Sequence, residues 1–456
     1  MQSQPQTEQP PTHAPSHRFD KYLGKLWRER DFRRLWLSLT ITHFGGQVTF
    51  LALPLTAAIM LSATPLQMGI LSAVEVLPYT LFGLFTGVLV DRSYKLPLII
   101  IADVGRGLAL LAIPIAAWFG VLSMPVLYAA GFIVGIGGII GWAAYQVFMA
   151  ERVGRDNLVE ANSRIALSDS ASQLVGPGLA GMLIHALTAP FAILLDAVSF
   201  FVSAIMLHGI TSHPGDAPLA RQKSETWRHA WAGIWSDAKE GLALIWRTPV
   251  LRSIAVSLMM WNLLKHVYLA IMILFATRDL ALSPGRIGII FMIAGLGFLA
   301  ASALCQRMNT RFGVGPVMLF GLTLSGASWL LVATVTAEYV TTLHLGTALF
   351  LFDFGAMIFF INYLTLRQAA VPSHLRGRVT STLIFIAVLL SPVGALLGGV
   401  MGTYFGLRST IAIAGFGGLI LGLALLRYSP LNAMHELPKA VEIGNPPALA
   451  PEMAAE

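Results

Sequence analysis

The chain has 456 residues, of which 56% are hydrophobic and only 12% charged, with a mean hydropathy of +0.71 and a formal net charge of +7. A soluble domain carries roughly 25% charged residues, so this chain cannot cover a water-facing surface, and we predict an all-α polytopic membrane protein. The single cysteine, Cys305, excludes a disulfide within the chain and argues against a thiolate metal site. We expect no metal and no cofactor.

The N-terminal segment, residues 1–32, has no apolar run long enough to span a membrane. Residues 1–17 are rich in Pro and Gln, which predicts disorder and not a cleaved signal peptide. Residues 18–34 are basic with apolar side chains at helical spacing, which fits either a short helix on an anionic membrane surface or a solvated lead-in.

Apolar runs of about 20 residues, the length that crosses a bilayer, follow one another along the rest of the chain. They predict twelve transmembrane helices, at roughly 33–60, 66–90, 96–118, 122–149, 163–186, 189–209, 250–277, 284–304, 314–335, 342–366, 378–400 and 405–427.

The one long interior gap, residues 210–249, is polar and divides these spans six and six. The groups before and after it, 33–209 and 250–427, have nearly equal lengths, which favours an internal duplication into two six-helix halves. Residues 428–456 are rich in Pro and Ala and predict a disordered tail.

Basic residues gather on one side of the predicted membrane. The other side carries only Arg278, Arg286 and Arg408. The positive-inside rule therefore places both termini and the central loop 210–249 in the cytoplasm. Because this asymmetry accounts for the net charge, we expect the lipid bilayer and no nucleic acid as a partner.

The loop between the second and third spans reads GVLVDRSYK. With twelve spans in two halves, it resembles the major facilitator superfamily, whose signature there is Gly, three residues, Asp, Arg, any residue, Gly and then basic residues. A Gly and a second basic residue are missing here. The resemblance implies a cytoplasmic latch between conformations, to which we also assign the i, i+3 pair Asp103 and Arg106. The matching positions are Gly87, Asp91, Arg92 and Lys95.

Further runs are similar to the branch of that superfamily that contains macrolide-efflux and enterobactin-exporter-like proteins. Gly176, Pro177 and Gly181 partly match a fifth-helix signature of antiporters, whereas the fourth span lacks the arginine that many proton-coupled members carry. The resemblance implies a monomeric transporter of the drug–proton antiporter type in the bacterial cytoplasmic membrane. The similar runs lie at 158–184, 194–204 and 366–379.

Glu75 lies well inside the second span, with Ser72, Tyr79 and Thr86 on the same helical face. An ionisable side chain there costs about 2.5–3.5 kcal/mol on insertion, so it is a candidate for function. Glu75 could bind and release a proton, or it could simply hydrogen-bond to a neighbouring helix. Both readings remain open at this stage.

Lys265 in the seventh span and Asp353 in the tenth are the next candidates. In the family that this chain resembles, the first, fourth, seventh and tenth helices line a central cavity, which implies that both residues face it. A direct pair would satisfy both charges. The pair would either hold two helices together or be the place where substrate and protons compete.

Other polar and aromatic residues of these four helices would form the cavity wall and suit a bulky, partly apolar ligand. His43 is a candidate proton carrier or a packed core histidine. Asp169 and Asp196 are expected to be structural, and the glycines between 131 and 141 to allow close helix packing. The wall candidates are His43, Gln47, Trp142, Tyr145, Gln146, Asn262 and His266.

No Walker motif and no hydrolytic or redox constellation is present in the sequence. We therefore expect not an enzyme but a secondary transporter, most simply a proton-driven exporter of a small organic molecule such as a drug-like compound or siderophore. The alternatives are an importer or facilitator of a small metabolite with the same fold, and a non-transporting membrane scaffold or sensor.

Overall fold

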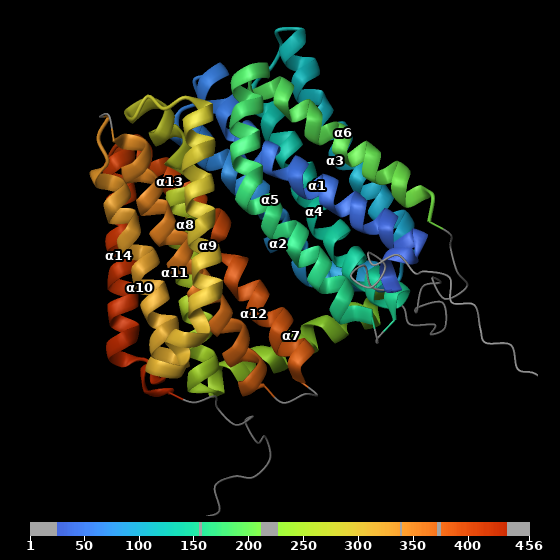
Figure 1. The fold of residues 1–456 in the computed structure, drawn as a ribbon. Coiled ribbons are helices and arrows are strands. Elements are labelled where there is room, and N and C mark those ends of the chain that lie inside the picture. The colour runs from blue at the N-terminus through green and yellow to red at the C-terminus, as the bar shows by residue number, and fades with distance from the viewer. Residues whose placement is uncertain (1–24, 155–156, 211–226, 338–339, 372–374, 436–456) are drawn as a thin grey trace, which may run out of the picture.

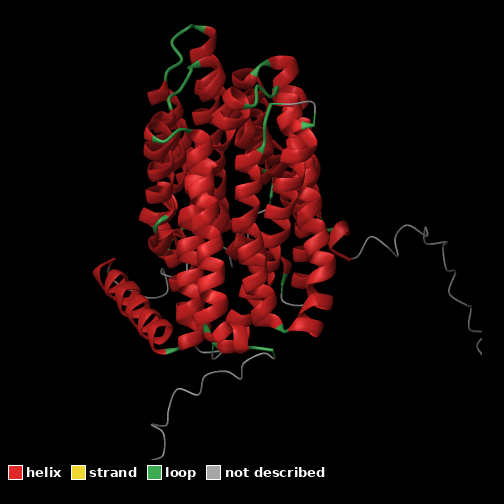
Figure 2. Cartoon of the chain, turned by 90° about the vertical axis from the view of Figure 1, so that its left-hand side faces the viewer, coloured by secondary structure: helices red, strands yellow, loops and turns green. Residues whose placement is uncertain are grey.

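The computed structural model describes residues 25–154, 157–210, 227–337, 340–371 and 375–435, and this part of the chain is almost entirely helical (Figures 1 and 2). Residues 1–24 of the predicted N-terminal segment, 436–456 of the predicted tail and 211–226 of the polar loop lie outside the described residues.

The helices of the N-terminal half follow the predicted spans closely. The first ends in a short π-helical turn, η3, before the chain reverses. Their bounds are α1 Arg30–Leu55, η3 Thr56–Met60, α2 Pro65–Asp91, α3 Lys95–Trp118, α4 Met124–Val153, α5 Leu158–Leu187 and α6 Ala189–His208.

The C-terminal half repeats this order, and its first span also ends in a π-helical turn, η7. The eleventh span of the chain is broken into α12 and α13 at Leu390. The break lies just before Pro392, which has no N–H to donate. The bounds are α8 Pro249–Leu274, η7 Phe275–Asp279, α9 Pro284–Phe312, α10 Val314–Thr334, α11 Thr341–Ala370, α12 Arg376–Leu389, α13 Ser391–Tyr404 and α14 Leu407–Tyr428.

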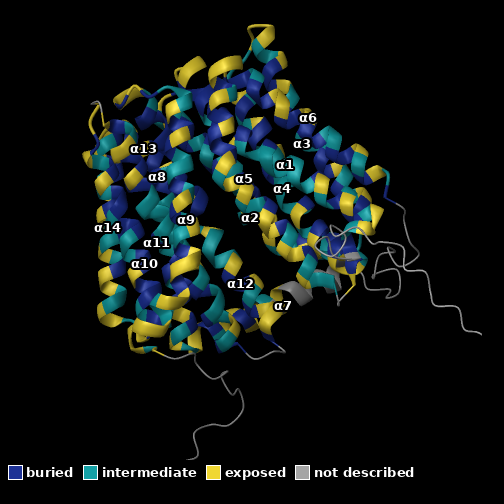
Figure 3. Ribbon diagram, viewed as in Figure 1, coloured by how far each residue is buried: buried dark blue, intermediate teal, exposed yellow. Residues whose placement is uncertain are grey.

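Eleven helical segments of the described chain are long and apolar enough to cross a membrane. The helix α5 is equally long, with 30 residues, but is more polar because it carries Glu160, Arg164 and Asp169. With α5, the predicted architecture of twelve spans is confirmed. The helices expose large apolar side chains such as Ile101, Ile205 and Ile420, as helices that face lipid do (Figure 3).

The same turn joins the first two spans of each half. Residues 61–65 and 280–284 read LSATP and LALSP, and Ser62 and Ala281 both have a φ of 48°. In each turn a Thr or Ser side chain caps the next helix, which begins with a proline. Because this turn recurs at equivalent positions of the two halves, it supports the predicted duplication.

The polar central segment contains a helix that we did not predict. The helix α7, Trp227–Arg247, packs on α12, where Arg378 pairs with Glu240 and Ile245 is fully buried. The predicted C-terminal tail also begins later than expected, because Pro430–Ala433 form a 3₁₀ turn that buries Leu431 against the C-terminal half. Both segments pack because apolar side chains recur at helical spacing within polar sequence.

The two halves touch at one end of the molecule and diverge toward the other, where α7 lies (Figure 1). One apolar core that includes Leu71 and Ile271 reaches across both halves at the end that bears the two repeated turns, the closed end. Toward the opposite, open end the core separates into one cluster around Phe148 and another around Phe359. The positive-inside rule predicts that the open end faces the cytoplasm.

Candidate functional site

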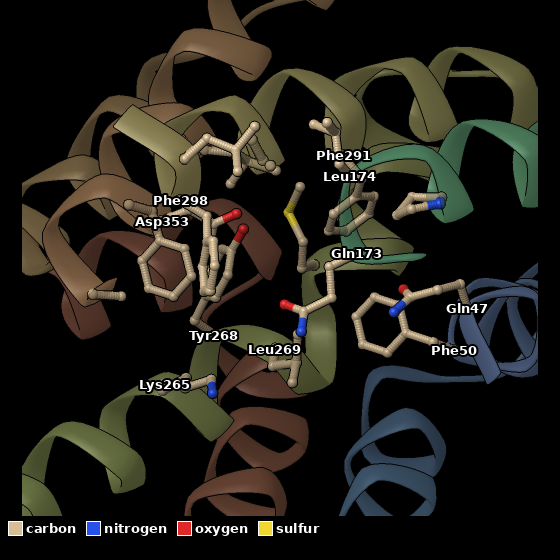
Figure 4. A pocket seen from close by; sticks show the side chains of 18 of the residues that line it. Gln47, Phe50, Gln173, Leu174, Lys265, Tyr268, Leu269, Phe291, Phe298 and Asp353 are labelled. Atoms are coloured by element: carbon tan, nitrogen blue, oxygen red, sulfur yellow. The ribbon is translucent and has the colours of Figure 1, made fainter. Parts of the chain in front are cut away.

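A cavity of about 440 Å³ lies between the two halves and takes its walls from both. The helices α1 and α5 contribute Gln47 and Gln173, and α8, α9 and α11 contribute aromatic side chains among aliphatic ones (Figure 4). We call this space the central cavity. Its aromatic residues are Phe50, Trp261, Tyr268, Phe291, Phe298 and Phe352.

Two charged residues line the central cavity, Lys265 of α8 and Asp353 of α11. The described residues include no ion pair within 4.0 Å between them. The Lys265 Nζ lies instead 5.1 Å from the centre of the Trp261 ring. The direct Lys265–Asp353 pair that we considered does not form in this conformation.

A second cavity, also of about 440 Å³, lies within the N-terminal half, and we call it the N-half cavity. It is lined by Glu75 of α2, Asp103 and Arg106 of α3, and Asp196 of α6. Asp196 accepts hydrogen bonds from Thr49 and, at 2.9 Å, from Ser199. Three carboxylic acids and one guanidinium therefore share one cavity.

The glycines of α4 make room for these side chains. A Cβ at Gly131 would lie 3.1 Å from the Glu75 Cγ, and one at Gly137 would lie 2.6 Å from the Arg106 Cγ. A Cβ at Gly141 would lie 3.1 Å from the Nη2 of the same guanidinium. Close packing along this run is as predicted, and the space gained holds the charged groups of α2 and α3.

Asp103 and Arg106, which we assigned to the cytoplasmic latch, line the N-half cavity in this conformation. Arg106 donates to Asp103, Ser203 of α6 donates to Asp103 at 2.6 Å, and the guanidinium lies 4.3 Å from the centre of the Phe200 ring. The reason is the rise of the helix. At 1.5 Å per residue, Asp103 lies about 12 Å deeper than the start of α3 at Lys95.

His43 lines the N-half cavity, one helical turn from Gln47 in the central cavity. Its Nδ1 lies 3.5 Å from an Asp169 oxygen, and Gln173 donates to Asp169 at 2.8 Å. Asp169, which we expect to be structural, thus contacts the candidate proton carrier His43.

Three wall candidates of α4 gather around a smaller space of about 330 Å³ next to His43. The Trp142 ring stacks on Tyr145 at 5.8 Å, and Gln146 lines the same space. Trp142 and Tyr145 also line the N-half cavity. None of the three is in the wall of the central cavity, where we had expected them.

Asn262 and His266 are also absent from that wall. Asn262 donates to the Leu258 carbonyl at 3.0 Å, and the His266 Nδ1 lies 2.8 Å from the Asn262 carbonyl. They sit about 60° and 100° around the helix from Lys265, so their side chains bond to their own helix instead of facing the cavity.

The residues of the predicted latch lie at the open end. Gly87 and Asp91 are exposed, and a Cβ at Gly87 would meet nothing within 4 Å. Arg92 caps the end of α2, and Lys95 is buried with its Nζ 3.9 Å from Glu151. In this conformation Gly87 therefore makes no close helix contact.

The Gly-Pro motif of α5 lies where the two halves meet. A Cβ at Gly176 would lie 2.5 Å from the Gln47 Cγ, and one at Gly181 would lie 2.9 Å from the Gly288 Cα of the other half. The Pro177 side chain lines the central cavity. The motif thus permits the close approach of α5 to α9 at the closed end.

Phe50 is one of the site residues that sequence reasoning missed. It lines the central cavity and the N-half cavity, and its ring meets Phe291 of the other half edge-on at 5.9 Å. A phenylalanine in an apolar span carries no sequence signal that separates this position from lipid-facing ones. Its place in both cavities and its ring contact with Phe291 identify it in the structure.

Within the part of the chain that the structure describes, no three His, Cys, Asp or Glu side chains come together as a metal site. Cys305 is buried and accepts weak hydrogen bonds from Asn309 and Asn362.

The sequence matches the family model of the Major Facilitator Superfamily over residues 35–273 and 253–451. It is 25% identical over 412 residues to the uncharacterized MFS-type transporter YfiS of Bacillus subtilis, covering 87% of this chain and 93% of the relative. The multidrug efflux pump Tap of Mycolicibacterium fortuitum is 25% identical, with coverage of 83% and 90%. The enterobactin exporter EntS of Citrobacter koseri is 24% identical, with coverage of 87% and 91%.

Solved structures share the fold at low identity. The nucleoside transporter NupG superposes with a TM-score of 0.67 at 11% identity, covering 87% of this chain and 98% of that one. A bacterial homologue of the iron transporter ferroportin in an inward-facing state gives 0.67 at 15% identity, with coverage of 88% and 99%. With two six-helix halves around a central cavity and a family model that matches nearly the whole membrane region, this chain belongs to the major facilitator superfamily of transporters.

Proposed function

We propose that this transporter exports small, partly aromatic organic molecules by alternating access, driven by proton entry. The observation that carries the proposal is the central cavity, which both halves line and which lies between a closed end and an open end. A ligand held there is exposed to opposite sides in turn as the halves rock.

The composition of the wall supports an organic ligand. Aromatic rings from both halves and the amides of Gln47 and Gln173 surround about 440 Å³, a volume typical of small-molecule sites. The relatives named as a multidrug efflux pump and an enterobactin exporter support outward transport. The solved structures show the fold alone.

Glu75 is our candidate for proton coupling. It lines the N-half cavity, and no described residue forms a hydrogen bond or ion pair with its side chain. A carboxylic acid without a fixed partner is free to exchange its proton with water that enters the cavity. His43 and the Asp103–Arg106 pair line the same space and can stabilise the charge that appears when Glu75 ionises.

The test is transport of ethidium by inverted membrane vesicles with an imposed pH gradient. We expect Glu75→Gln to abolish gradient-driven accumulation while ethidium still binds, because the variant keeps the shape of the side chain but cannot ionise. Glu160→Gln is the matched control, since Glu160 pairs with Arg164 at the end of α5, away from both cavities. Equal accumulation by wild type and Glu75→Gln would remove Glu75 from coupling.

A further inference from the structure

Both charges of the central cavity come from the C-terminal half. Lys265 lies on α8 and Asp353 on α11, whereas α1 and α5 contribute only neutral side chains to the wall. In Figure 4 the two charged residues lie on one side of the cavity, and Gln47 and Phe50 lie on the other. The cavity therefore has a charged wall and a neutral wall.

Neither charge is satisfied by a protein group of opposite sign in direct contact. The Lys265 Nζ has a ring face at 5.1 Å as its neighbour, and no described residue donates a hydrogen bond to Asp353. Two opposite charges held apart in one cavity leave room between them for groups that complement each. An ionised group away from water is stable only when such a partner is present.

We propose that the central cavity recognises zwitterionic amphiphiles, molecules with an ammonium group and a carboxylate at one end and an aromatic body at the other; this rests on the transport function proposed above. The ligand carboxylate meets Lys265, and its ammonium group meets Asp353. A ligand with only one charge leaves the other protein charge without a partner, and this is the origin of the selectivity.

The uncharged part of the cavity suits the aromatic body. Phe50 and Phe291 come from opposite halves and meet edge to face at 5.9 Å, so a flat ring system can pack against both. Gln47 and Gln173 add hydrogen-bonding groups without charge. The ligand thus touches both halves, with its charged end on the C-terminal half and its aromatic body between rings of the two halves.

The probe is Nε-dansyl-lysine, which has a free α-amino acid head and a fluorescent aromatic body. Its methyl ester carries only the ammonium charge, and its Nα-acetyl derivative carries only the carboxylate. Dansyl fluorescence is titrated with the purified full-length protein in detergent. We expect the wild type to bind the zwitterion roughly tenfold or more tightly than either derivative.

Variants assign each charge. In Lys265→Gln the preference for a free carboxylate should disappear, so that the zwitterion and the methyl ester bind alike. In Asp353→Asn the zwitterion and the acetyl derivative should bind alike. His266→Asn is the control, because His266 adjoins Lys265 in sequence but does not line the cavity.

Equal binding of all three probes to the wild type would overturn the proposal, and that result does not depend on whether any variant folds. A preference that survives in both Lys265→Gln and Asp353→Asn would overturn it as well. Gradient-driven accumulation of the same three dansyl probes in inverted vesicles, measured in parallel, keeps the two proposals apart. Charge-independent dansyl binding with intact gradient-driven accumulation refutes only the substrate class, whereas the absence of gradient-driven accumulation of all three probes refutes the proposed function.

Discussion

The contact between α5 and α9 at the closed end predicts how one added methyl group shifts the transport cycle. A Cβ at Gly288 would lie 2.6 Å from the Pro177 carbonyl oxygen and 3.0 Å from the Gly181 Cα. Real Cβ atoms essentially never come closer than 3.0 Å to such neighbours, and backbone atoms cannot rotate away. In Gly288→Ala the two helices must therefore move apart.

The cost falls on one conformation only. Overpacking of this kind costs about 1–3 kcal/mol, and it is absent once α5 and α9 separate. A differential cost of about 1–3 kcal/mol changes the ratio of two states by roughly 5–150-fold. We expect Gly288→Ala to populate a state in which the closed end has opened.

Gly285→Ala is the matched control. It lies on the same helix, three residues away, and a Cβ there would meet nothing within 4 Å. Both substitutions change helix propensity by about 1 kcal/mol in the same direction, so this effect cancels in the comparison. Only the contact with α5 differs between them.

Electron–electron distances between spin labels measure the shift. Labels at Val121 and Tyr404 report the closed end, since both residues are exposed in loops or helix ends of opposite halves. Labels at Val159 and Phe312 report the open end. The native cysteine, Cys305, is buried and is replaced by serine in all samples.

In Gly288→Ala the Val121–Tyr404 distance should lengthen and the Val159–Phe312 distance should shorten, whereas Gly285→Ala should match the wild type. If Gly288→Ala gives wild-type distance distributions while the protein remains monodisperse, the closed-end contact does not control the equilibrium. That result would refute the reasoning from helix approach.

Three further outcomes follow from the site. Replacing Arg106 by Gln leaves Asp103 buried without its cation and should lower the free energy of unfolding by about 3–5 kcal/mol, seen as a lower Tm in detergent. Adding Asp103→Asn should restore part of the lost stability. A double variant no more stable than Arg106→Gln alone would contradict the pairing. Phe50 lines both cavities, so Phe50→Ala should allow substrate to bind without proton release, measured with a pH dye. Phe298→Ala, which changes only the central cavity, should retain proton release. Equal proton release by both variants would refute the shared-wall role of Phe50. Glu240→Gln removes a half-exposed ion pair of α7 and should change stability by less than about 1 kcal/mol, so a large fall in Tm would show that this contact holds α7 in place.

The spans were predictable because lipid imposes one strong rule, an apolar run of fixed length. The helix α7 was missed although its apolar residues recur at helical spacing, because a polar average conceals an amphipathic pattern. The turn at 280–284 could have been matched to 61–65 by eye. The positive φ at Ala281 could not have been predicted, since alanine carries no preference for positive φ.

Site residues were harder to predict than spans. The helix and approximate depth of Lys265 and Asp353 led correctly to the central cavity, whereas Asn262 and His266 failed because neighbours in sequence point 60–100° apart on a helix. Trp142 and Tyr145 failed for another reason. The polar interior of the N-terminal half is a second compartment, and no sequence pattern states that one bundle encloses two.

Beside its apolar core, the closed end contains several contacts that are made by bare backbone. Gly69 meets Gly399, Gly181 meets Gly288, and the Arg278 guanidinium reaches only a main-chain oxygen, that of Ala63, at 2.8 Å. When two helices with interlocked side chains separate, each side chain must adopt a new rotamer. Helices that meet through glycines separate without that rearrangement. Contacts of this kind need little free energy to separate and re-form in one register. They therefore suit a barrier that must open once for every molecule carried.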